Sequence, residues 1–205
     1  AAGAAGAPVA DVVASSTDPS ALGSAFMVVT AVEGETIARK ILRDDRFRHA
    51  REVLPAQLGA ALAQVHAVDT TGLSSLPTAD QVRQYREALD QMGQPHPAFE
   101  LAFKWLDANR PEVGPPVLVH GDFRLGNVIV GDDGRVWLCD WNWPVVGAAW
   151  IDSLFLLVEA RGDGVDVEEV LARRALTRDV PADHVDRVIA LLAGYFLRQA
   201  QLPVP

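Results

Sequence analysis

The stretch VLVHGDFRLGNVIV, residues 117–130, decides the fold because it sets a polar segment between two apolar runs. The β-branched runs at 117–119 and 127–130 predict two short buried strands. Between them stand side chains that carry chemistry, namely His120, Asp122, Arg124 and Asn127. A folded domain that buries both strands has to accommodate these groups, so we expect the segment between the strands to hold a functional site.

A third strand is predicted at 136–139, after the turn GDDG at 131–134. A hairpin brings its two ends together, so Asp140 can face Asn127 while Asp122 stands beside them. One carboxylate and one amide oxygen suit Mg²⁺, which keeps water and phosphate as its other ligands. A second carboxylate, free of metal, can accept a proton from a hydroxyl nucleophile. The spacing Asp-x4-Asn followed by Asp is that of a kinase catalytic loop.

The motif His120-Gly121-Asp122, with Asn127 and Asp140, resembles the aminoglycoside phosphotransferase family, which shares the protein-kinase-like fold. Three further stretches are similar to that family: FMVVTAVEG at 26–34, LAQVHAVD at 62–69 and GAAWIDSLFLL at 147–157. The resemblance implies an α+β fold, with a remnant N-lobe strand pair and a mainly helical C-lobe that carries a catalytic hairpin. The H-G-D form, and no A-P-E stretch after Asp140, argue against a protein kinase.

The resemblance also implies roles. Asp122 would position the acceptor hydroxyl and take its proton, and Arg124 would reach the transferred phosphate. Asn127 and Asp140 would hold Mg²⁺ against the phosphates of ATP. The hinge would hydrogen-bond adenine through the carbonyl of Ala31 and the N–H of Val32.

Structural readings compete with these roles. Asp122 and Asn127 also suit a turn, and Arg124 also suits an ion pair with a surface carboxylate. We expect His120 to be a structural ring held by backbone hydrogen bonds, and Asp152 to pack under the catalytic loop. His66 is expected to be a hydrogen-bonded histidine of the core or its rim, and Cys139 an inert thiol. Four tryptophans suit either core packing or an aromatic wall: Trp137, Trp141, Trp143 and Trp150.

Composition limits the partners. The net charge is −9 and the apolar fraction 49%, and the pI is about 4.9. Such a surface does not attract nucleic acid or anionic lipid, but it suits a cationic small molecule. The single cysteine excludes an internal disulfide and fits a cytoplasmic protein. The apolar run at 188–197 is too short for a membrane span, which needs roughly 20 residues. Nothing in the sequence indicates the oligomeric state.

Periodicity and turn residues predict the remaining elements. Strands at 8–14 and 25–32 should form a hairpin. One helix is expected at 50–68. A second should begin at a capping box of Thr78 and Gln81 and end at about Met92, and a third should begin at Pro97. Three more helices are expected at 150–160, 166–177 and 182–200, and residues 111–116 should be a linker.

In the family, a glycine-rich loop, a strand lysine and a helix glutamate precede the hinge. Here only 24 residues precede Ala25, and both lysines, Lys40 and Lys104, follow the hinge. We therefore expect residues 1–34 to be a remnant of the ATP lobe with the hinge, and 35–205 to be the helical C-lobe. The chain would begin just before the fourth N-lobe strand and stop before the family's last helix. Two functions stay open: an ATP- and Mg²⁺-dependent phosphotransferase acting on a small-molecule hydroxyl, and a non-catalytic kinase-like binding module.

Overall fold

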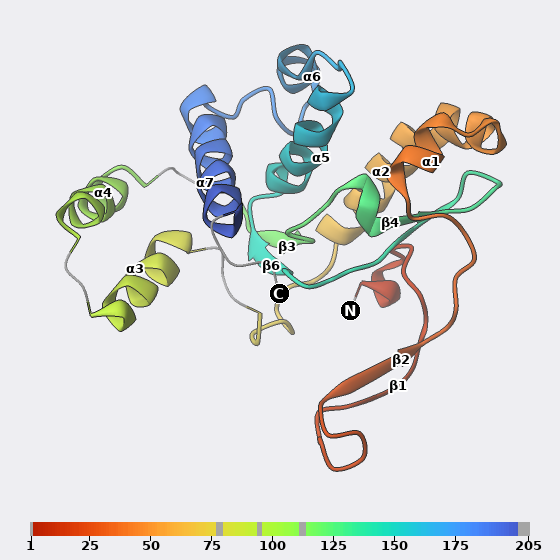
Figure 1. The fold of residues 1–205 in the computed structure, drawn as a ribbon, viewed down its shortest axis with the longest axis horizontal. Helices are drawn as coiled ribbons and strands as arrows, with labels where there is room; N and C mark the ends of the chain where they lie inside the picture. The colour runs from red at the N-terminus through yellow and green to blue at the C-terminus, as the bar shows by residue number, and fades with distance from the viewer. Residues whose placement is uncertain (1, 77–79, 94–95, 111–113, 201–205) are drawn as a thin grey trace. The chain divides into compact units, whose positions relative to one another are not determined.

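The computed structural model describes residues 2–76, 80–93, 96–110 and 114–200 (Figure 1). The chain divides into two compact units between Asp152 and Ser153. Each unit is described by itself below. A division by compactness does not locate a nucleotide cleft, so the lobe boundary expected at residue 34 stays a prediction.

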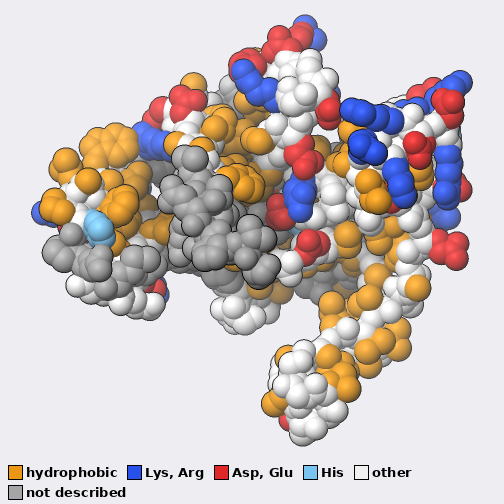
Figure 2. Space-filling view, viewed as in Figure 1, with side chains coloured by type: hydrophobic (Ala, Val, Ile, Leu, Met, Phe, Trp, Pro, Cys, Tyr) orange, Lys and Arg blue, Asp and Glu red, His pale blue; other side chains and the backbone are white. Residues whose placement is uncertain are grey.

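The first unit begins with a 3-10 turn, Gly3–Ala5, and the expected hairpin of β1 (Val12–Ser16) and β2 (Phe26–Val29). The strands are antiparallel, with Ser16 opposite Phe26. β1 starts later than predicted because Pro8 and Val9 contact β5 (Val136–Leu138) instead: the N–H of Leu138 donates to the Pro8 carbonyl at 2.7 Å. Val13 is 66% exposed and Met27 64%, and hydrophobic side chains line the hairpin in Figure 2.

The core of this unit lies along α2. Helix α1 (Ala38–Arg43) and the 3-10 turn Asp45–Phe47 lead into α2 (Arg48–His66). Buried residues recur on α2 at spacings of three and four, as the periodicity predicted; they are Ala50, Leu54, Leu58, Ala61, Leu62 and Val65. This face contacts β3 (Val117–Val119) and β5, so α2 supports the strand before the polar segment and the hairpin that follows it.

Those strands form two separate pairs. β4 (Val128–Val130) and β5 (Val136–Leu138) make the predicted antiparallel hairpin. β3 (Val117–Val119) pairs instead with β6 (Val145–Gly147), a strand that the sequence analysis did not predict. The β3–β6 pair places residues 140–144 beside the loop that follows β3, and it therefore shapes the candidate site.

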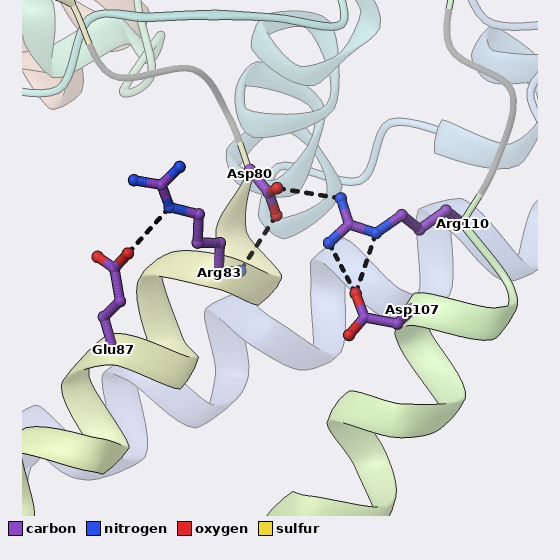
Figure 3. A network of polar contacts seen from close by, with 5 residues as sticks. All are labelled: Asp80, Arg83, Glu87, Asp107 and Arg110. Carbon is purple, nitrogen blue, oxygen red and sulfur yellow. Dashed lines mark hydrogen bonds and ion pairs between the residues drawn. The ribbon is translucent and has the colours of Figure 1, made fainter.

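Helices α3 (Gln81–Met92) and α4 (Pro97–Ala108) follow α2 in the chain. Asp80 is the N-cap of α3 and accepts a hydrogen bond from the N–H of Arg83, while Thr78 of the expected capping box lies outside the described residues. Pro97 opens α4 as predicted. Arg110 links the two helices, with Asp80 at 3.0 Å and Asp107 at 2.7 Å (Figure 3). The apolar side of α4 is exposed, with Leu101 at 70%.

The second unit holds most of α5 (Trp150–Gly162), whose first residues belong to the first unit, together with α6 (Val167–Arg173) and α7 (Ala182–Ala200). α6 ends before the predicted residue 177. There the buried Thr177 donates its hydroxyl to the Leu171 carbonyl at 2.7 Å, which favours a turn over another helical step. Among the helices described, none is both long and apolar enough to cross a bilayer.

Candidate active site

The loop of residues 120–127 connects β3 to β4 and begins at a glycine that no other residue can replace without strain. Gly121 has φ of +81°, in the left-handed region. A Cβ atom built there would lie 2.0 Å from the carbonyl oxygen of Trp143. The backbone of residues 140–144, held by β6, therefore packs directly on the loop. This contact explains why the motif reads H-G-D rather than H-R-D.

A buried carboxylate anchors the same turn from the other side. Asp152, in the first turn of α5, is fully buried and accepts two backbone hydrogen bonds, from His120 at 2.9 Å and Gly121 at 3.0 Å. The expectation that Asp152 packs under the loop is confirmed. His66 on α2 also lies close, with Nε2 3.5 Å from Asp152 Oδ2. It makes no hydrogen bond there, so the expected hydrogen-bonded histidine is not what the geometry shows.

His120 holds the loop against β5. Its Nε2 lies 3.0 Å from the Cys139 carbonyl, and its Nδ1 lies 3.4 Å from the backbone N–H of Asp122. A ring with its proton on Nε2 satisfies both contacts, donating to the carbonyl and accepting from the amide. The ring of Trp141 lies 4.5 Å away. His120 is fully buried, so it has the structural role that the sequence analysis expected.

Asp122 and Asn127 meet within the loop. The Asn127 amide donates to Asp122 Oδ2 at 2.7 Å and to the Asp122 carbonyl at 2.9 Å. Arg124 also donates to Asp122 Oδ2, from Nε at 3.3 Å. The Asn127 residue is 3% exposed, whereas the Asp122 side chain is 34% exposed. A buried amide thus orients a carboxylate that a ligand can reach.

The β4–β5 hairpin brings Asp140 to the same place. The N–H of Cys139 donates to the Asn127 carbonyl at 3.0 Å, so Asp140 follows immediately after the residue paired with Asn127. Asp140 has φ of +61°, uncommon outside glycine. Asn142, which the sequence analysis missed, donates from its side chain to Asp140 Oδ1 and from its backbone to the Asp140 carbonyl. The D-x-N spacing was the available signal, because amide and carboxylate side chains two residues apart favour such turns.

The amide nitrogen of Asn127 is used by Asp122, which leaves its oxygen as the atom that can face a cation. Together with the Asp140 carboxylate, this gives two hard oxygen donors from the protein. That donor set fits Mg²⁺, which takes few protein ligands and retains water and phosphate. It does not fit zinc, which needs three or four nitrogen or sulfur-rich ligands. Among the described residues no group of three His, Cys, Asp or Glu side chains is placed to bind a metal.

Ala31 and Val32 lie apart from this loop, on a cavity of about 550 Å³. Residues 30–34, within the expected hinge, line one side of it and the β4–β5 turn lines another. The lining carries four carboxylates and two guanidinium groups: Asp11, Glu33, Asp132, Asp133, Arg46 and Arg135. Arg46 pairs with Asp132 at 2.6 Å, and Arg135 stacks over Trp137 at 5.5 Å. Neither arginine was predicted to belong to a site.

The tryptophans and the cysteine complete the surroundings. Trp143 is 61% exposed, and Trp137, Trp141 and Trp150 are each half-buried, so complete core packing is excluded for all four. Cys139 directly follows β5 and is half-buried. Burial, with a smaller effect of the neighbouring Asp140 charge, raises the pKa of its thiol. A thiol with a raised pKa forms less thiolate, which fits the expectation that Cys139 is inert.

Comparison with known proteins concerns the family and the fold of the chain. The sequence profile of the phosphotransferase enzyme family, APH, matches residues 1–193. A curated relative, acyl-CoA dehydrogenase family member 10 of Mus musculus, is 29% identical over 164 residues, which are 74% of this chain and 15% of that protein.

Solved structures with the same fold include an aminoglycoside phosphotransferase of Ralstonia eutropha JMP134, at 23% identity and a TM-score of 0.55. That alignment covers 76% of this chain and 50% of the other. Another is the streptomycin–ATP–APH(2")-IIa ternary complex, at 18% identity and a TM-score of 0.56, covering 93% of this chain and 72% of that one. This chain thus spans between 15% and 72% of these relatives.

Proposed function

Because the chain belongs to the phosphotransferase enzyme family and has its protein-kinase-like fold, we propose that it takes part in transfer of the γ-phosphoryl group of ATP to a hydroxyl of a small molecule. The observation that carries the proposal is the meeting of Asp122, Asn127 and Asp140. A single buried amide orients one carboxylate through its nitrogen, and the backbone hydrogen bond from Cys139 to the Asn127 carbonyl sets Asp140 next to the same residue. Phosphoryl transfer needs such positioned charge more than it needs covalent chemistry.

In the proposed reaction the acceptor oxygen attacks the γ-phosphorus. A new O–P bond forms, the bond to the bridging oxygen breaks and ADP leaves. The proton of the acceptor hydroxyl passes to the Asp122 carboxylate, which Asn127 holds in one orientation. Arg124 pairs with Asp122 in this structure. We propose that its guanidinium turns to the transferred phosphate when nucleotide binds, where it neutralises charge.

Asn127 and Asp140 are the residues that would hold Mg²⁺. When bound, the ion would neutralise negative charge on the phosphates. The chain's own part is to keep the two oxygens fixed. Asn142 does this for Asp140, by binding its side chain and its carbonyl. The β4–β5 hairpin does it for Asn127, through the hydrogen bond from Cys139.

Ala31 and Val32 are proposed to bind the adenine ring, through the Ala31 carbonyl and the Val32 N–H. Their position on the 550 Å³ cavity supports this proposal. With four carboxylates and two guanidinium groups on its lining, the cavity favours an uncharged ring over phosphates. The proposed acceptor is a hydroxylated amine, because a chain of net charge −9 attracts cations. Streptomycin is bound in one protein of the same fold.

The test is nucleotide binding measured by calorimetry with a non-hydrolysable ATP analogue, with and without Mg²⁺. We expect Mg²⁺ to strengthen binding at least about tenfold in the wild-type chain, and Asp140→Ala to abolish that gain because Asn127 alone is neutral. Asp163→Ala, at an exposed carboxylate of the second unit, is the matched control. A Mg²⁺ gain that survives Asp140→Ala would show that the metal binds elsewhere. ADP release with a panel of hydroxylated amines then tests transfer itself.

A further inference from the structure

One large aromatic side chain beside the 120–127 loop has no part in the function proposed above. Trp143 is 61% exposed, whereas two other tryptophans near the loop already have a partner. The ring of Trp141 lies 4.5 Å from that of His120, and the guanidinium of Arg135 lies 5.5 Å from the ring of Trp137. Among the described residues, no other ring and no guanidinium packs on Trp143. Its indole is therefore available to a ligand.

The backbone of Trp143 is fixed against the catalytic loop. A Cβ atom built on Gly121 would lie 2.0 Å from the carbonyl oxygen of Trp143 and 3.2 Å from its Cβ. Two residues further on, Val145 pairs with Val119, the last residue of β3. The exposed ring is thus attached beside the residue that directly precedes Asp122. A single exposed apolar side chain is ordinary on a protein surface, but this one is held where the proposed function requires an acceptor to bind.

An indole and a carboxylate in the same region suit a cation. The face of an aromatic ring attracts an ammonium group, and tryptophan does so more strongly than tyrosine or phenylalanine. The Asp122 side chain is 34% exposed, and the chain carries a net charge of −9. Both the nearby carboxylate and the charge of the whole chain therefore favour a cationic group over a neutral or anionic one.

We propose that Trp143 is a specificity-determining residue for the acceptor: its indole face binds the ammonium group of a hydroxylated amine whose hydroxyl lies at Asp122. This inference rests on the function proposed above, because only that function places an acceptor hydroxyl at Asp122. It also narrows the class of acceptor. The ammonium group and the reacting hydroxyl must be close enough to reach two side chains of neighbouring segments at once, which favours compact amino alcohols over amines whose charge is remote from the hydroxyl.

Two small alcohols of similar shape separate the effect of charge from the effect of bulk. One is trans-4-aminocyclohexanol, which carries an ammonium group, and the other is trans-4-methylcyclohexanol, which carries a methyl group in its place. Trp143→Phe keeps an aromatic face, whereas Trp143→Leu keeps only an apolar side chain. Trp105→Leu is the matched control, because Trp105 is 48% exposed and lies on α4, outside the loop.

The experiment is nuclear magnetic resonance on the ¹⁵N-labelled chain, titrated with each alcohol in turn. The indole N–H signal that is missing from Trp143→Phe identifies Trp143, and in the wild type it should shift more with the amine than with the methyl compound. The wild-type chain should bind the amine more tightly, and this preference should fall about threefold in Trp143→Leu, as expected for loss of one exposed cation–π contact. Trp143→Phe should retain most of the preference, and Trp105→Leu all of it.

Steady-state kinetics extend the test to transfer. For a hydroxylated amine that supports ADP release, Trp143→Leu should raise KM for the amine about threefold and leave KM for ATP unchanged, because the ring contacts only the acceptor. Trp105→Leu should change neither constant.

Two results would overturn the proposal. One is a Trp143 indole signal that does not move with the amine or moves as far with the methyl compound, and the other is an unchanged preference in Trp143→Leu. If Trp143→Leu does not fold, the wild-type titration and Trp143→Phe still decide. The titrations require no turnover. A chain that binds the amine at Trp143 but releases no ADP would therefore contradict the proposed function and leave the cation contact intact.

Discussion

The 120–127 loop and the α3–α4 pair are both rich in charged residues, but the two regions use them differently. The contacts that anchor the loop are buried and reach backbone groups: Asp152 binds two amides and His120 binds a carbonyl. In α3 and α4, the contacts include pairs of exposed side chains, such as Arg83 with Glu87 (Figure 3). Buried contacts to the backbone fix one conformation, whereas exposed ion pairs are screened and typically contribute about 0–1 kcal/mol.

The apolar residues follow the same contrast. Phe123 and Leu125, inside the loop, are buried, whereas Leu101 and Trp105 on α4 are exposed, and Figure 2 shows hydrophobic side chains gathered over α4. A groove of about 570 Å³ runs along that face of α4. The difference shows that the loop is held in place by its own surroundings. The described contacts of α3 and α4 hold these helices mainly to each other.

The largest effect is expected from Gly121→Ala. The new Cβ would clash with the Trp143 carbonyl, and the left-handed φ disfavours alanine. Strain and overpacking together should lower the free energy of unfolding by about 3 kcal/mol, measured by urea denaturation. Gly59→Ala is the control, since Gly59 lies within α2 and a Cβ there meets nothing within 4 Å. That variant should gain about 0.5–1 kcal/mol. Equal stability of the two variants would mean that the loop is not tightly packed.

Asp122→Asn is expected to change the free energy of unfolding less than Gly121→Ala does. Its clear effect should be on the rate of turnover. The amide keeps the shape and can still accept the hydrogen bond from Asn127, but it cannot take a proton from the acceptor. We expect kcat for ADP release to fall by about 10² or more, with KM for ATP nearly unchanged. Asp163→Asn, at an exposed carboxylate, should leave both constants unchanged. Turnover retained in Asp122→Asn would exclude Asp122 as the proton acceptor.

Local patterns made the loop predictable. The two apolar runs, the GDDG turn and the position of Asp140 all follow from residues close together in the chain, and the structure confirms the hairpin that they imply. β6 was missed because VVG at 145–147 has only two β-branched residues between Pro144 and a helix, which is too short a run to predict a strand. Its partner is β3, some 28 residues earlier. Pairing at that separation depends on tertiary packing, which local periodicity does not report.

Side-chain contacts were the least predictable part of the site. The resemblance placed Asp152 under the loop, but nothing in the sequence indicated the distance from His66 to it. The exposure of Leu101 and Trp105 on α4 was not predicted either. Amphipathic patterns tell which side of a helix is apolar, and they do not tell what covers that side. The roles assigned to Ala31, Val32, Arg124, Asn127 and Asp140 stay predictions.

The smallest effect is expected at Asp80, and it separates the two functions of one half-buried carboxylate. Asp80 caps α3 through the N–H of Arg83 and pairs with Arg110. Asp80→Ala removes both contacts and should lower the free energy of unfolding by about 1 kcal/mol, as for other N-caps. Asp80→Asn retains a good cap and loses only the screened ion pair, so it should cost about 0.3 kcal/mol. If the two variants were equally unstable, the pair with Arg110 and not the cap would stabilise α3.

Acid should remove the difference between wild type and Asp80→Asn. The Arg110 guanidinium, and next the N–H of Arg83, lower the pKa of Asp80 in the folded chain. A carboxyl whose pKa is lowered by folding contributes its stability above the pKa of the unfolded chain, about 3.9, and loses it as the pH falls through the folded value. Denaturation at pH 7 and at pH 3 should therefore show a difference between the two chains that shrinks at pH 3. Glu87→Gln, which breaks only the exposed pair with Arg83, is the control for general screening effects. The difference is taken as the free energy of unfolding of the wild type minus that of Asp80→Asn. If this value rose in acid, the charge on Asp80 would oppose folding and Arg110 would not offset it.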